Sequence, residues 1–377
     1  MDISTLCIHG SDEPRDCTGS VTVPIYQTAT FAHPAVGQST GYDYSRLQNP
    51  TREHLEKIIA QLEHGDDAMA FSSGMAAVAT VMELFQVGDH IIASDDLYGG
   101  SIRLFRNISE KNGLSFDFVN TSDLSVIEQY LKPQTKAIFI ETPTNPMMRV
   151  TDIAAVSAVA QKHRLLTIVD NTFLTPYFQN PIQLGADIVI HSGTKYLCGH
   201  NDTLAGFAVT AAPELSEKLR FIYKTTGACL SPFDSWLLIR GIKTLPIRMD
   251  KQQENAVKLA NWLCTQPKIK AVHYAGLPSH PDYAVTLKQT KGFGAMISFE
   301  VDKEETARKL LENVKLVLYA ESLGGVETLI TYPMMQTHAD VPKLEREAKG
   351  INECLLRLSV GLEFIDNIID DIKQALA

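Results

Sequence analysis

The chain has 377 residues, of which 45% are hydrophobic and 21% are charged, a composition typical of a folded globular protein. Its 34 Lys and Arg residues against 44 Asp and Glu residues give a formal net charge of −10. This acidic balance disfavours a general binder of nucleic acid or anionic membranes, because such proteins need clustered positive charge. No run of about 18 apolar residues occurs, so we predict no membrane span.

The termini and the cysteines indicate a cytoplasmic protein. Residues 1–4 lack a basic segment followed by an apolar run, so we expect no secretory signal. The six cysteines are scattered and form no CxxC pair, which favours free thiols over a disulfide framework. His191 and His200 lack the spacing of metal ligands, so we expect no metal site.

The first two thirds of the chain predict an α/β domain behind an extended arm. Residues 1–50 are rich in Gly, Pro, Ser and Thr with little periodicity, and Asn49 and Pro50 then begin an amphipathic helix. Beyond Ser73, short apolar runs alternate with helical patterns. The predicted strands are 90–94, 115–119, 136–141, 165–170 and 187–191, and the predicted helices are 74–85, 101–112, 124–131 and 153–163. This alternation predicts βαβ units and a mostly parallel sheet covered on both faces.

The pattern changes past about residue 245. Helices are predicted at 248–264, 304–313 and 365–376, and strands at 269–274, 294–301 and 355–360. This order is typical of a smaller α+β domain. We therefore divide the chain into an arm (1–50), an α/β domain (51–245) and a C-terminal α+β domain (246–377).

Ligands of an open parallel sheet bind beyond the carboxyl ends of its strands, and the residues there suggest a specific chemistry. Asp170 ends one predicted strand, and Lys195 comes after the next. Pyridoxal phosphate (PLP) needs a lysine amine for its Schiff base and a carboxylate facing its ring nitrogen. Gly74 and Met75 open a helix whose free amides suit the phosphate, and hydroxyl groups beside Lys195 can add donors.

Seven motifs occur along the chain: Tyr44-Ser45-Arg46 with Asn49-Pro50-Thr51, Ser73-Gly74-Met75, 95–100, 141–146, 169–172, 192–196 and 357–361. Taken together, they resemble the PLP-dependent enzymes of cysteine and methionine metabolism over essentially the whole chain. This family includes cystathionine γ-synthase, cystathionine β- and γ-lyase, methionine γ-lyase and O-acetylhomoserine sulfhydrylase. The resemblance implies a large PLP-binding domain of the aspartate-aminotransferase type (fold type I), with a seven-stranded sheet, and a smaller C-terminal domain.

The resemblance also implies roles for individual residues. Lys195 would bind the cofactor and move protons, Asp170 would pair with the ring nitrogen, and Tyr98 would stack on the ring and help activate the substrate amine. The phosphate would be held by Gly74, Met75, Ser192 and Thr194, together with Tyr44 and Arg46 from a neighbouring subunit. The substrate would contact Asn145, Glu321, Ser322, Thr337 and Arg357, of which Asn145, Ser322 and Arg357 would bind its α-carboxylate. Sharing of Tyr44 and Arg46 predicts a homotetramer, built as two dimers with shared active sites.

Local sequence favours γ-replacement on an O-acyl-L-homoserine, with cysteine giving L-cystathionine and sulfide an additional acceptor giving homocysteine. The stretches 200–206 and 232–238, and 331–333 with 336–338, most resemble bacterial cystathionine γ-synthases. A carbon–sulfur lyase acting on cystathionine is the alternative, with methionine γ-lyase disfavoured because Gly100 replaces a cysteine there. A third interpretation is a protein that holds the cofactor without catalysing a reaction. The presence of all three residues Lys195, Asp170 and Arg357 disfavours it.

Three positions leave further questions open. Gly193 and Cys198 stand where most family members have Ala and Gly, so both bear on substrate size and rate. Cys198 is either a redox-sensitive thiol or, as we expect, a small packed residue. Glu321 is either a solvated surface acid or the group that meets the distal ammonium of cystathionine.

Overall fold

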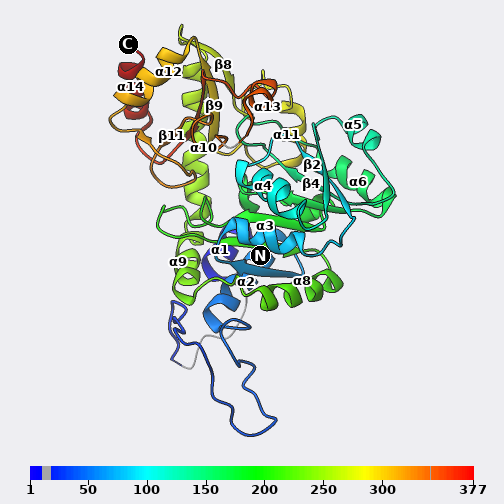
Figure 1. The fold of residues 1–377 in the computed structure, drawn as a ribbon. Coiled ribbons are helices and arrows are strands. Elements are labelled where there is room, and N and C mark those ends of the chain that lie inside the picture. The colour runs from blue at the N-terminus through cyan, green and yellow to red at the C-terminus, as the bar shows by residue number, and fades with distance from the viewer. Residues whose placement is uncertain (11–17, 340) are drawn as a thin grey trace.

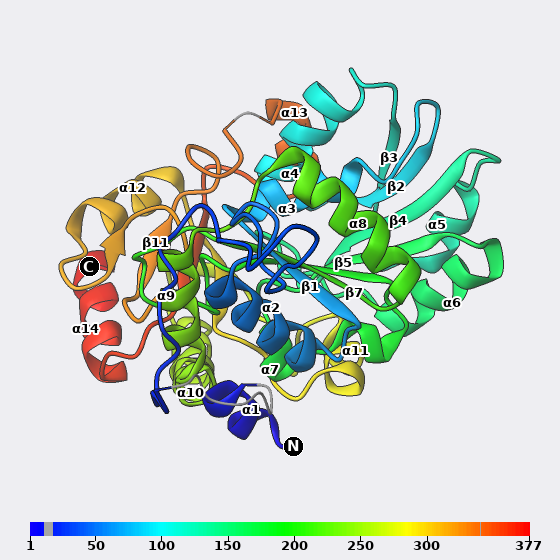
Figure 2. The same ribbon diagram turned by 90° about the horizontal axis from the view of Figure 1, so that it is seen from below.

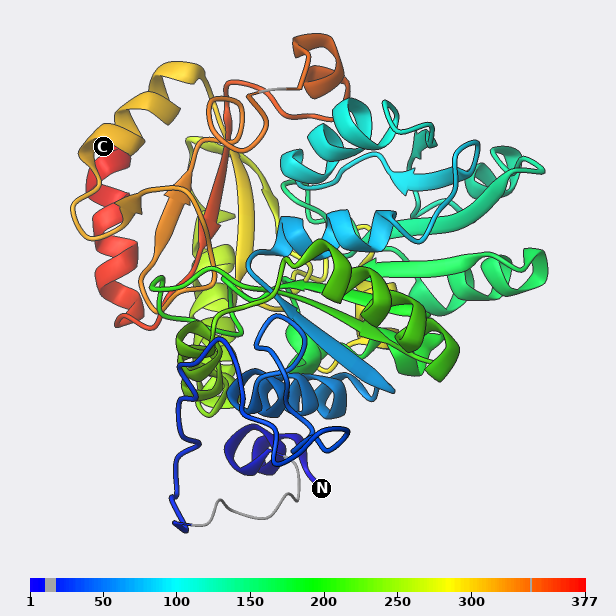
Figure 3. The ribbon, with the colours of Figure 1, turned by 60° about the horizontal axis from the view of Figure 1, so that its bottom comes forward.

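The computed structural model describes residues 1–10, 18–339 and 341–377 (Figure 1). These residues form two mixed sheets with helices packed around them. The two parts lie side by side, the second sheet and its helices beside the larger sheet (Figures 2 and 3). In the described part of the chain, no helix combines the length and apolar character needed to cross a membrane.

The large sheet has seven strands in the order β1-β7-β6-β5-β4-β2-β3. Strand β7 runs antiparallel to both β1 and β6, and the other neighbours pair in parallel. A mostly parallel sheet is therefore confirmed. The bounds are β1 Asp67–Phe71, β2 His90–Ser94, β3 Ser115–Val119, β4 Thr135–Glu141, β5 Leu166–Asp170, β6 Ile188–Ser192 and β7 Gly206–Thr210.

Helices cover both faces of this sheet because alternate strand residues point to opposite sides. Ile188 and Ile190 pack with the apolar cluster of α3 (Gly74–Met82), α4 (Gly99–Leu104) and α8 (Pro213–Thr226). Val189, between them, packs with the cluster of α2 (Pro50–Glu63) and α6 (Ile153–His163). The remaining elements of this part are α5 Leu124–Gln129, the π-helix η1 Phe105–Ser109, α7 Thr175–Phe178, the 3-10 helix η2 Pro181–Leu184 and α9 Pro232–Ile242.

The second sheet has five strands in the order β10-β11-β12-β9-β8. Helix α10 (Leu245–Leu263) packs against α7 of the first part and against β8, β9 and α14 of the second. The bounds are β8 Ile269–His273, α11 Tyr283–Gln289, β9 Met296–Val301, α12 Glu304–Asn313, β10 Leu318–Tyr319, β11 Leu329–Thr331, α13 Lys343–Ala348, β12 Leu355–Ser359 and α14 Ile365–Leu376.

Every strand and helix predicted from the sequence is present, with shifted ends in most cases. The helix predicted at 101–112 is instead α4 followed by the π-turn of η1. Strands β1 and β7 were not predicted. The prediction of an extended arm is wrong for residues 3–9, which form the helix α1 (Ile3–His9). The Asp2 side chain caps this helix by accepting a hydrogen bond from the Ser4 amide. Residues 18–49 contain no helix or regular strand and extend away from both sheets, and 11–17 of the predicted arm, including Cys17, lie outside the described residues (Figure 1).

Candidate active site

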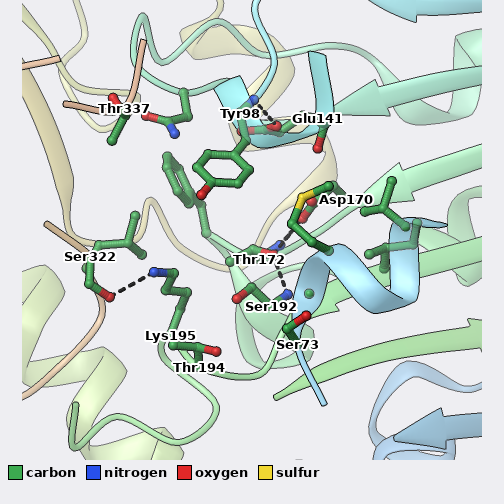
Figure 4. Close-up of a pocket in the computed structure, with 18 of the residues that line it drawn as sticks. Ser73, Tyr98, Glu141, Asp170, Thr172, Ser192, Thr194, Lys195, Ser322 and Thr337 are labelled. Atoms are coloured by element: carbon green, nitrogen blue, oxygen red, sulfur yellow. Dashed lines mark hydrogen bonds between the residues drawn. The ribbon is translucent and has the colours of Figure 1, made fainter. Parts of the chain in front are cut away.

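A cavity of about 350 Å³ opens at the carboxyl ends of β4, β5 and β6, where the sequence placed the chemistry. All but two of the predicted site residues line it. They come from both parts of the chain, so the cavity lies where the large sheet meets loops of the second (Figure 4). The predicted residues that line it are Gly74, Met75, Tyr98, Asn145, Asp170, Ser192, Thr194, Lys195, Glu321, Ser322, Thr337 and Arg357.

Lys195 lies after β6 in the turn that leads to β7, and its side chain points across the cavity (Figure 4). The Nζ atom donates a hydrogen bond to the Ser322 hydroxyl at 2.8 Å. Burial, with the charge of Arg357, lowers the pKa of Lys195 to about 8, and the Glu321 charge opposes this shift. A substantial fraction of neutral amine therefore exists near neutral pH, which is the form needed for a nucleophile or base.

Asp170 ends β5 and is joined to Ser192 at the end of β6 through one threonine. The Thr172 hydroxyl donates to Asp170 Oδ1 at 2.6 Å and accepts a hydrogen bond from the Ser192 amide at 2.9 Å. The Thr172 amide also donates to Oδ1, at 3.0 Å. Burial raises the pKa of Asp170, and these hydrogen bonds oppose that change. Both bonds fall on one oxygen, so the other is available to a ligand.

Glu141, at the end of β4, forms a second buried carboxyl at the cavity wall. Its Oε2 accepts a hydrogen bond from the Tyr98 amide at 2.8 Å, which fixes the start of α4 and with it the Tyr98 ring (Figure 4). Burial, together with the nearby Asp170 charge, raises the pKa of Glu141 well above its usual value. Two close carboxylates resist simultaneous ionisation, so Glu141 is the carboxyl that more readily keeps a proton.

The N-terminus of α3 presents backbone amide donors at the cavity wall. Ser73 caps the helix by accepting a hydrogen bond from the Ala76 amide at 3.1 Å, whereas the first-turn amides of Gly74 and Met75 have no acceptor within the helix. A Cβ atom at Gly74 would lie 3.0 Å from Ser192 Cβ, so glycine lets the helix approach β6 closely. Such an end attracts phosphate through its amides and dipole.

Arg357 lies in β12 and reaches the cavity from the second sheet. It is buried, and it donates to Asn145 Oδ1 at 2.8 Å, to the Ser322 carbonyl at 3.1 Å and to the Thr331 hydroxyl at 3.2 Å. Its Nε has no partner within the described chain. Burial lowers the pKa of Arg357 to about 10, which still leaves it charged at neutral pH. A buried cation with an unused donor suits a carboxylate ligand.

The other two predicted substrate contacts occupy the rim and the wall. Glu321 is exposed at the cavity rim, next to Ser322. The Thr337 hydroxyl forms a hydrogen bond with His338 Nδ1 at 2.8 Å, and its carbonyl packs so closely on Gly99 that a Cβ atom there would lie 2.1 Å away. Glu321 is therefore the freer of the two to meet a ligand.

The structure does not bring Tyr44 and Arg46 into the cavity. Both are exposed on the arm, where the Arg46 guanidinium lies 5.7 Å from the centre of the Tyr44 ring and donates to the Lys224 carbonyl. Their contribution to a neighbouring subunit's site stays a prediction.

The departures from the family pattern have clear packing environments. A Cβ atom at Gly193 would lie 2.6 Å from the Phe207 ring and 3.0 Å from Ala205 Cβ, so this turn is packed too tightly for alanine without movement. The Cys198 thiol is buried and donates to Asp202 Oδ1 at 3.1 Å. Burial and Asp202 raise the pKa of Cys198 to about 12, which fits a packed and unreactive thiol.

Two further residues of the site, Glu141 and Thr172, were given no role from the sequence, and Ser73 was predicted only as part of the turn that precedes Gly74 and Met75. Each lies within one of the seven motifs, either at a strand end or before a helix start. The contact of Thr172 could have been expected from its spacing to Asp170, because an aspartate side chain commonly accepts a hydrogen bond from the backbone amide two residues on, as it does here. Nothing in the sequence indicates that Glu141 would bond to the Tyr98 amide, which is 43 residues away.

These features fit pyridoxal phosphate. The N-terminus of α3 suits its phosphate, and the Lys195 amine, with its lowered pKa, suits its aldehyde. The second carboxylate oxygen of Asp170 accepts no hydrogen bond from the described residues, so it suits a protonated ring nitrogen.

Comparison with known proteins agrees. Residues 4–377 match the family described as Cys/Met metabolism PLP-dependent enzyme. Over 376 residues, covering 100% of this chain and 99% of the relative, the chain is 48% identical to the cystathionine gamma-lyase of Bacillus subtilis (strain 168). It is 49% identical to the cystathionine beta-lyase of Lactococcus lactis subsp. cremoris (strain MG1363), with 99% and 98% of the two chains covered.

Relatives with a synthase name are equally similar. Identity to the cystathionine gamma-synthase of Haemophilus influenzae is 47%, with 100% and 98% covered. A solved structure of cystathionine gamma-lyase from Lactobacillus plantarum, complexed with L-serine, matches with a TM-score of 0.97 and 44% identity over 100% of this chain and 98% of the other. The chain therefore belongs to the PLP-dependent enzymes of cysteine and methionine metabolism, with the fold of type I PLP enzymes and pyridoxal 5'-phosphate as its cofactor.

Proposed function

We propose that this enzyme catalyses γ-replacement on an O-acyl-L-homoserine, with cysteine as the thiol and L-cystathionine as the product. Sulfide is a second acceptor, giving homocysteine. The observation that carries the proposal is the position of Glu321, whose exposed carboxylate stands at the cavity rim beside the half-buried Lys195 and Ser322. A negative charge there suits the distal ammonium of cystathionine, which both a synthase and a cystathionine lyase must bind. The preference for synthesis rests on the local resemblance of 200–206, 232–238, and 331–333 with 336–338 to bacterial cystathionine γ-synthases.

The chain's own groups divide the work. When bound, PLP supplies an aldehyde that bonds to amines and a ring that accepts electrons from the substrate's Cα. Arg357 and Asn145 bind and orient the substrate carboxylate, and the lowered pKa of Lys195 lets its amine accept a proton from Cα and return it nearby. Asp170 would hold a proton on the ring nitrogen, and Tyr98 would stack on the ring and help activate the substrate amine. Gly74, Met75, Ser192 and Thr194 would hold the phosphate.

A carbon–sulfur lyase that cleaves cystathionine is the second candidate. It is favoured by the names of the relatives at 48% and 49% identity, cystathionine gamma-lyase and cystathionine beta-lyase. Both reactions use the same removal of the Cα proton. They differ in the carbon, Cβ or Cγ, from which the leaving group departs. They differ again in the following step, which is either addition of a thiol or hydrolysis to a keto acid and ammonia.

A substrate panel separates the two. Purified enzyme is incubated with O-acetylhomoserine plus cysteine, and separately with cystathionine alone, while cystathionine, pyruvate and 2-oxobutyrate are quantified. We expect cystathionine formation to be faster than keto acid release. Faster release of either keto acid from cystathionine would replace the synthase proposal by the lyase.

We also propose the assembly and domain arrangement that the resemblance implies. Residues 1–50 would act as an arm carrying Tyr44 and Arg46 to a neighbouring subunit's phosphate, in a homotetramer of two dimers. Residues 51–245 would form the PLP-binding domain and 246–377 the C-terminal domain. This division is supported by α10, which begins at Leu245 and leads to the second sheet. The free thiols of the described chain fit a cytoplasmic enzyme.

A further inference from the structure

Helix α10 carries a row of buried polar side chains on one face. Arg248, Gln252 and Asn255 follow one another at spacings of four and three residues, which places them on the same side of the helix. Their exposed fractions are 3%, 0% and 0%. Burying polar groups costs free energy unless they are hydrogen-bonded, so the hydrogen-bond partners of these three side chains indicate what the side chains do. All three donate to backbone carbonyls outside α10.

Arg248 binds the segment that carries Lys195. Its guanidinium donates to the carbonyl of Tyr196 at 2.7 Å, to that of Gly241 at 2.9 Å and to the Thr244 hydroxyl at 3.1 Å. It has no carboxylate partner among the described residues, so neutral acceptors alone compensate its buried charge. The guanidinium therefore binds the backbone directly after Lys195, at the Tyr196 carbonyl.

The turn after Lys195 is shaped around this guanidinium. Gly199 has a φ of +75°, and a Cβ atom there would lie 2.0 Å from Arg248 Nη1. The Gly199 amide in turn donates to the Lys195 carbonyl at 2.8 Å. A residue with a side chain at position 199 would displace the guanidinium, so Gly199 and Arg248 together fix the backbone of Lys195.

Gln252, one turn further along α10, binds the segment that carries Ser322. Its Nε2 donates to the Gly325 carbonyl at 2.7 Å. The two segments also touch each other, because a Cβ atom at Gly324 would lie 2.6 Å from the Tyr196 nitrogen and 2.9 Å from the Lys195 carbonyl carbon. Successive turns of one helix therefore hold the two backbones whose side chains meet in the Lys195–Ser322 hydrogen bond.

We infer that Arg248 and Gln252 are positioning residues that set the place of the Lys195 amine relative to Ser322 by anchoring both segments to α10. The inference rests on the proposed function only in taking Lys195 as the PLP-binding lysine. Neither side chain lines the cavity, so each acts through the backbone and not on a ligand.

The test compares holoenzyme variants Arg248→Lys and Gln252→Leu with Asn180→Ala. Asn180 is a matched control, because it is buried and its side chain donates to the carbonyls of Leu62 and Pro176, which do not line the cavity. Three quantities are measured: kcat and KM, the pH midpoint of the visible absorbance of Lys195-bound PLP, and hydrogen exchange of residues 193–199 and 320–326.

For Gln252→Leu we expect kcat to fall by about tenfold or more with a smaller change in KM, since small misplacements of a catalytic group are costly. The absorbance midpoint shifts, and exchange rises in both segments. In Arg248→Lys we expect hydrogen exchange to rise more in residues 193–199 than in 320–326. If Arg248→Lys is insoluble, the result for Gln252→Leu alone decides the test. Asn180→Ala loses thermal stability but keeps the wild-type midpoint and the wild-type exchange in both segments.

Wild-type kcat, midpoint and local exchange in Gln252→Leu would overturn the inference, as would equal changes in Asn180→Ala. Failure of the proposed function looks different, because the wild-type enzyme itself would then carry no PLP on Lys195 or would not form cystathionine. A wild type that holds PLP on Lys195 but acts as a lyase leaves the anchoring test fully interpretable.

Discussion

The amine of Lys195 and the hydroxyl of Ser322 lie 2.8 Å apart although 127 residues separate them in the sequence. Lys195 comes after a strand of the large sheet, whereas Ser322 belongs to the loop between β10 and β11 of the second. Ser322 has a φ of +89°, a backbone conformation that is costly for a residue other than glycine, and Arg357 holds its carbonyl. In this conformation the Ser322 hydroxyl lies next to the half-buried amine of Lys195.

Thr172 is expected to control the charge of Asp170. Thr172→Val removes the hydroxyl that donates to Asp170 and accepts from Ser192, so the carboxylate loses a hydrogen bond that favours its ionised form. We expect kcat/KM to fall by about ten- to a hundredfold, because hydrogen bonds to charged groups contribute about 1.5–3 kcal/mol. Thr172→Ser keeps the hydroxyl and should retain most activity. Equal kinetics for Val and Ser variants would refute this role.

PLP uptake by the cofactor-free protein should depend on pH through Lys195. Its pKa is lowered from 10.5 to about 8 by burial, and only the neutral amine attacks the aldehyde. The uptake rate is therefore expected to rise about tenfold per pH unit below pH 8 and to level off above it. Stopped-flow absorbance measures this profile, and a rate still rising steeply at pH 9.5 would contradict it.

A substitution of Glu321 is expected to shift the pH dependence of PLP uptake. Its negative charge raises the pKa of Lys195, so Glu321→Gln should move the midpoint of PLP uptake to lower pH. Glu327→Gln changes an exposed acid of the same loop and should leave the midpoint in place. A shift upward in Glu321→Gln would show that this carboxylate does not act on Lys195.

Arg357 should contribute mainly to substrate binding. Arg357→Lys cannot reproduce the planar guanidinium that binds Asn145 and presents an unused Nε donor, so we expect KM for the amino acid substrate to rise about a hundredfold with a smaller change in kcat. Thr331→Val removes a hydroxyl that also bonds Arg357 but does not line the cavity. Steady-state kinetics should show less than about a threefold change in its KM. The assignment is lost if Arg357→Lys keeps the wild-type KM.

Shared active sites predict complementation between two inactive variants. In a heterodimer of Arg46→Ala and Lys195→Ala subunits, one site would combine an intact Arg46 with an intact Lys195, so about half of the wild-type activity should return. Co-expression with two different tags yields the heterodimer for assay. No activity in verified heterodimers would place Arg46 outside its neighbour's site.

The sequence predicts the layered α/β part well because its strands are buried on both faces and read as short apolar runs between helical patterns. The elements that it misses include the strands β1 and β7, the helices α8 and α9 and the π-turn of η1. Strand β7 follows the irregular Lys195 segment and pairs antiparallel with both of its neighbours. It therefore does not follow the alternation of strand and helix on which the prediction of βαβ units rests. The short helix α1 is missed because its single cap, Asp2, stands in a segment without clear periodicity.

Strand ends and family motifs together predict most residues of the candidate site. They do not predict the pairing between distant segments. The Glu141 contact with the Tyr98 amide and the anchoring of the Lys195 turn by Arg248 depend on tertiary packing over 43 and 52 residues. Such contacts leave no periodic trace in a single sequence.

Reduction of the PLP-loaded enzyme with borohydride, followed by digestion and mass spectrometry of the peptides, tests the central claim. A pyridoxyl phosphate adduct is expected on Lys195, with loss of the visible absorbance band, and Lys195→Ala should give neither the band nor a labelled peptide at that position. An adduct on a different lysine, with Lys195 recovered unmodified, would contradict the assignment of this cavity as the PLP site.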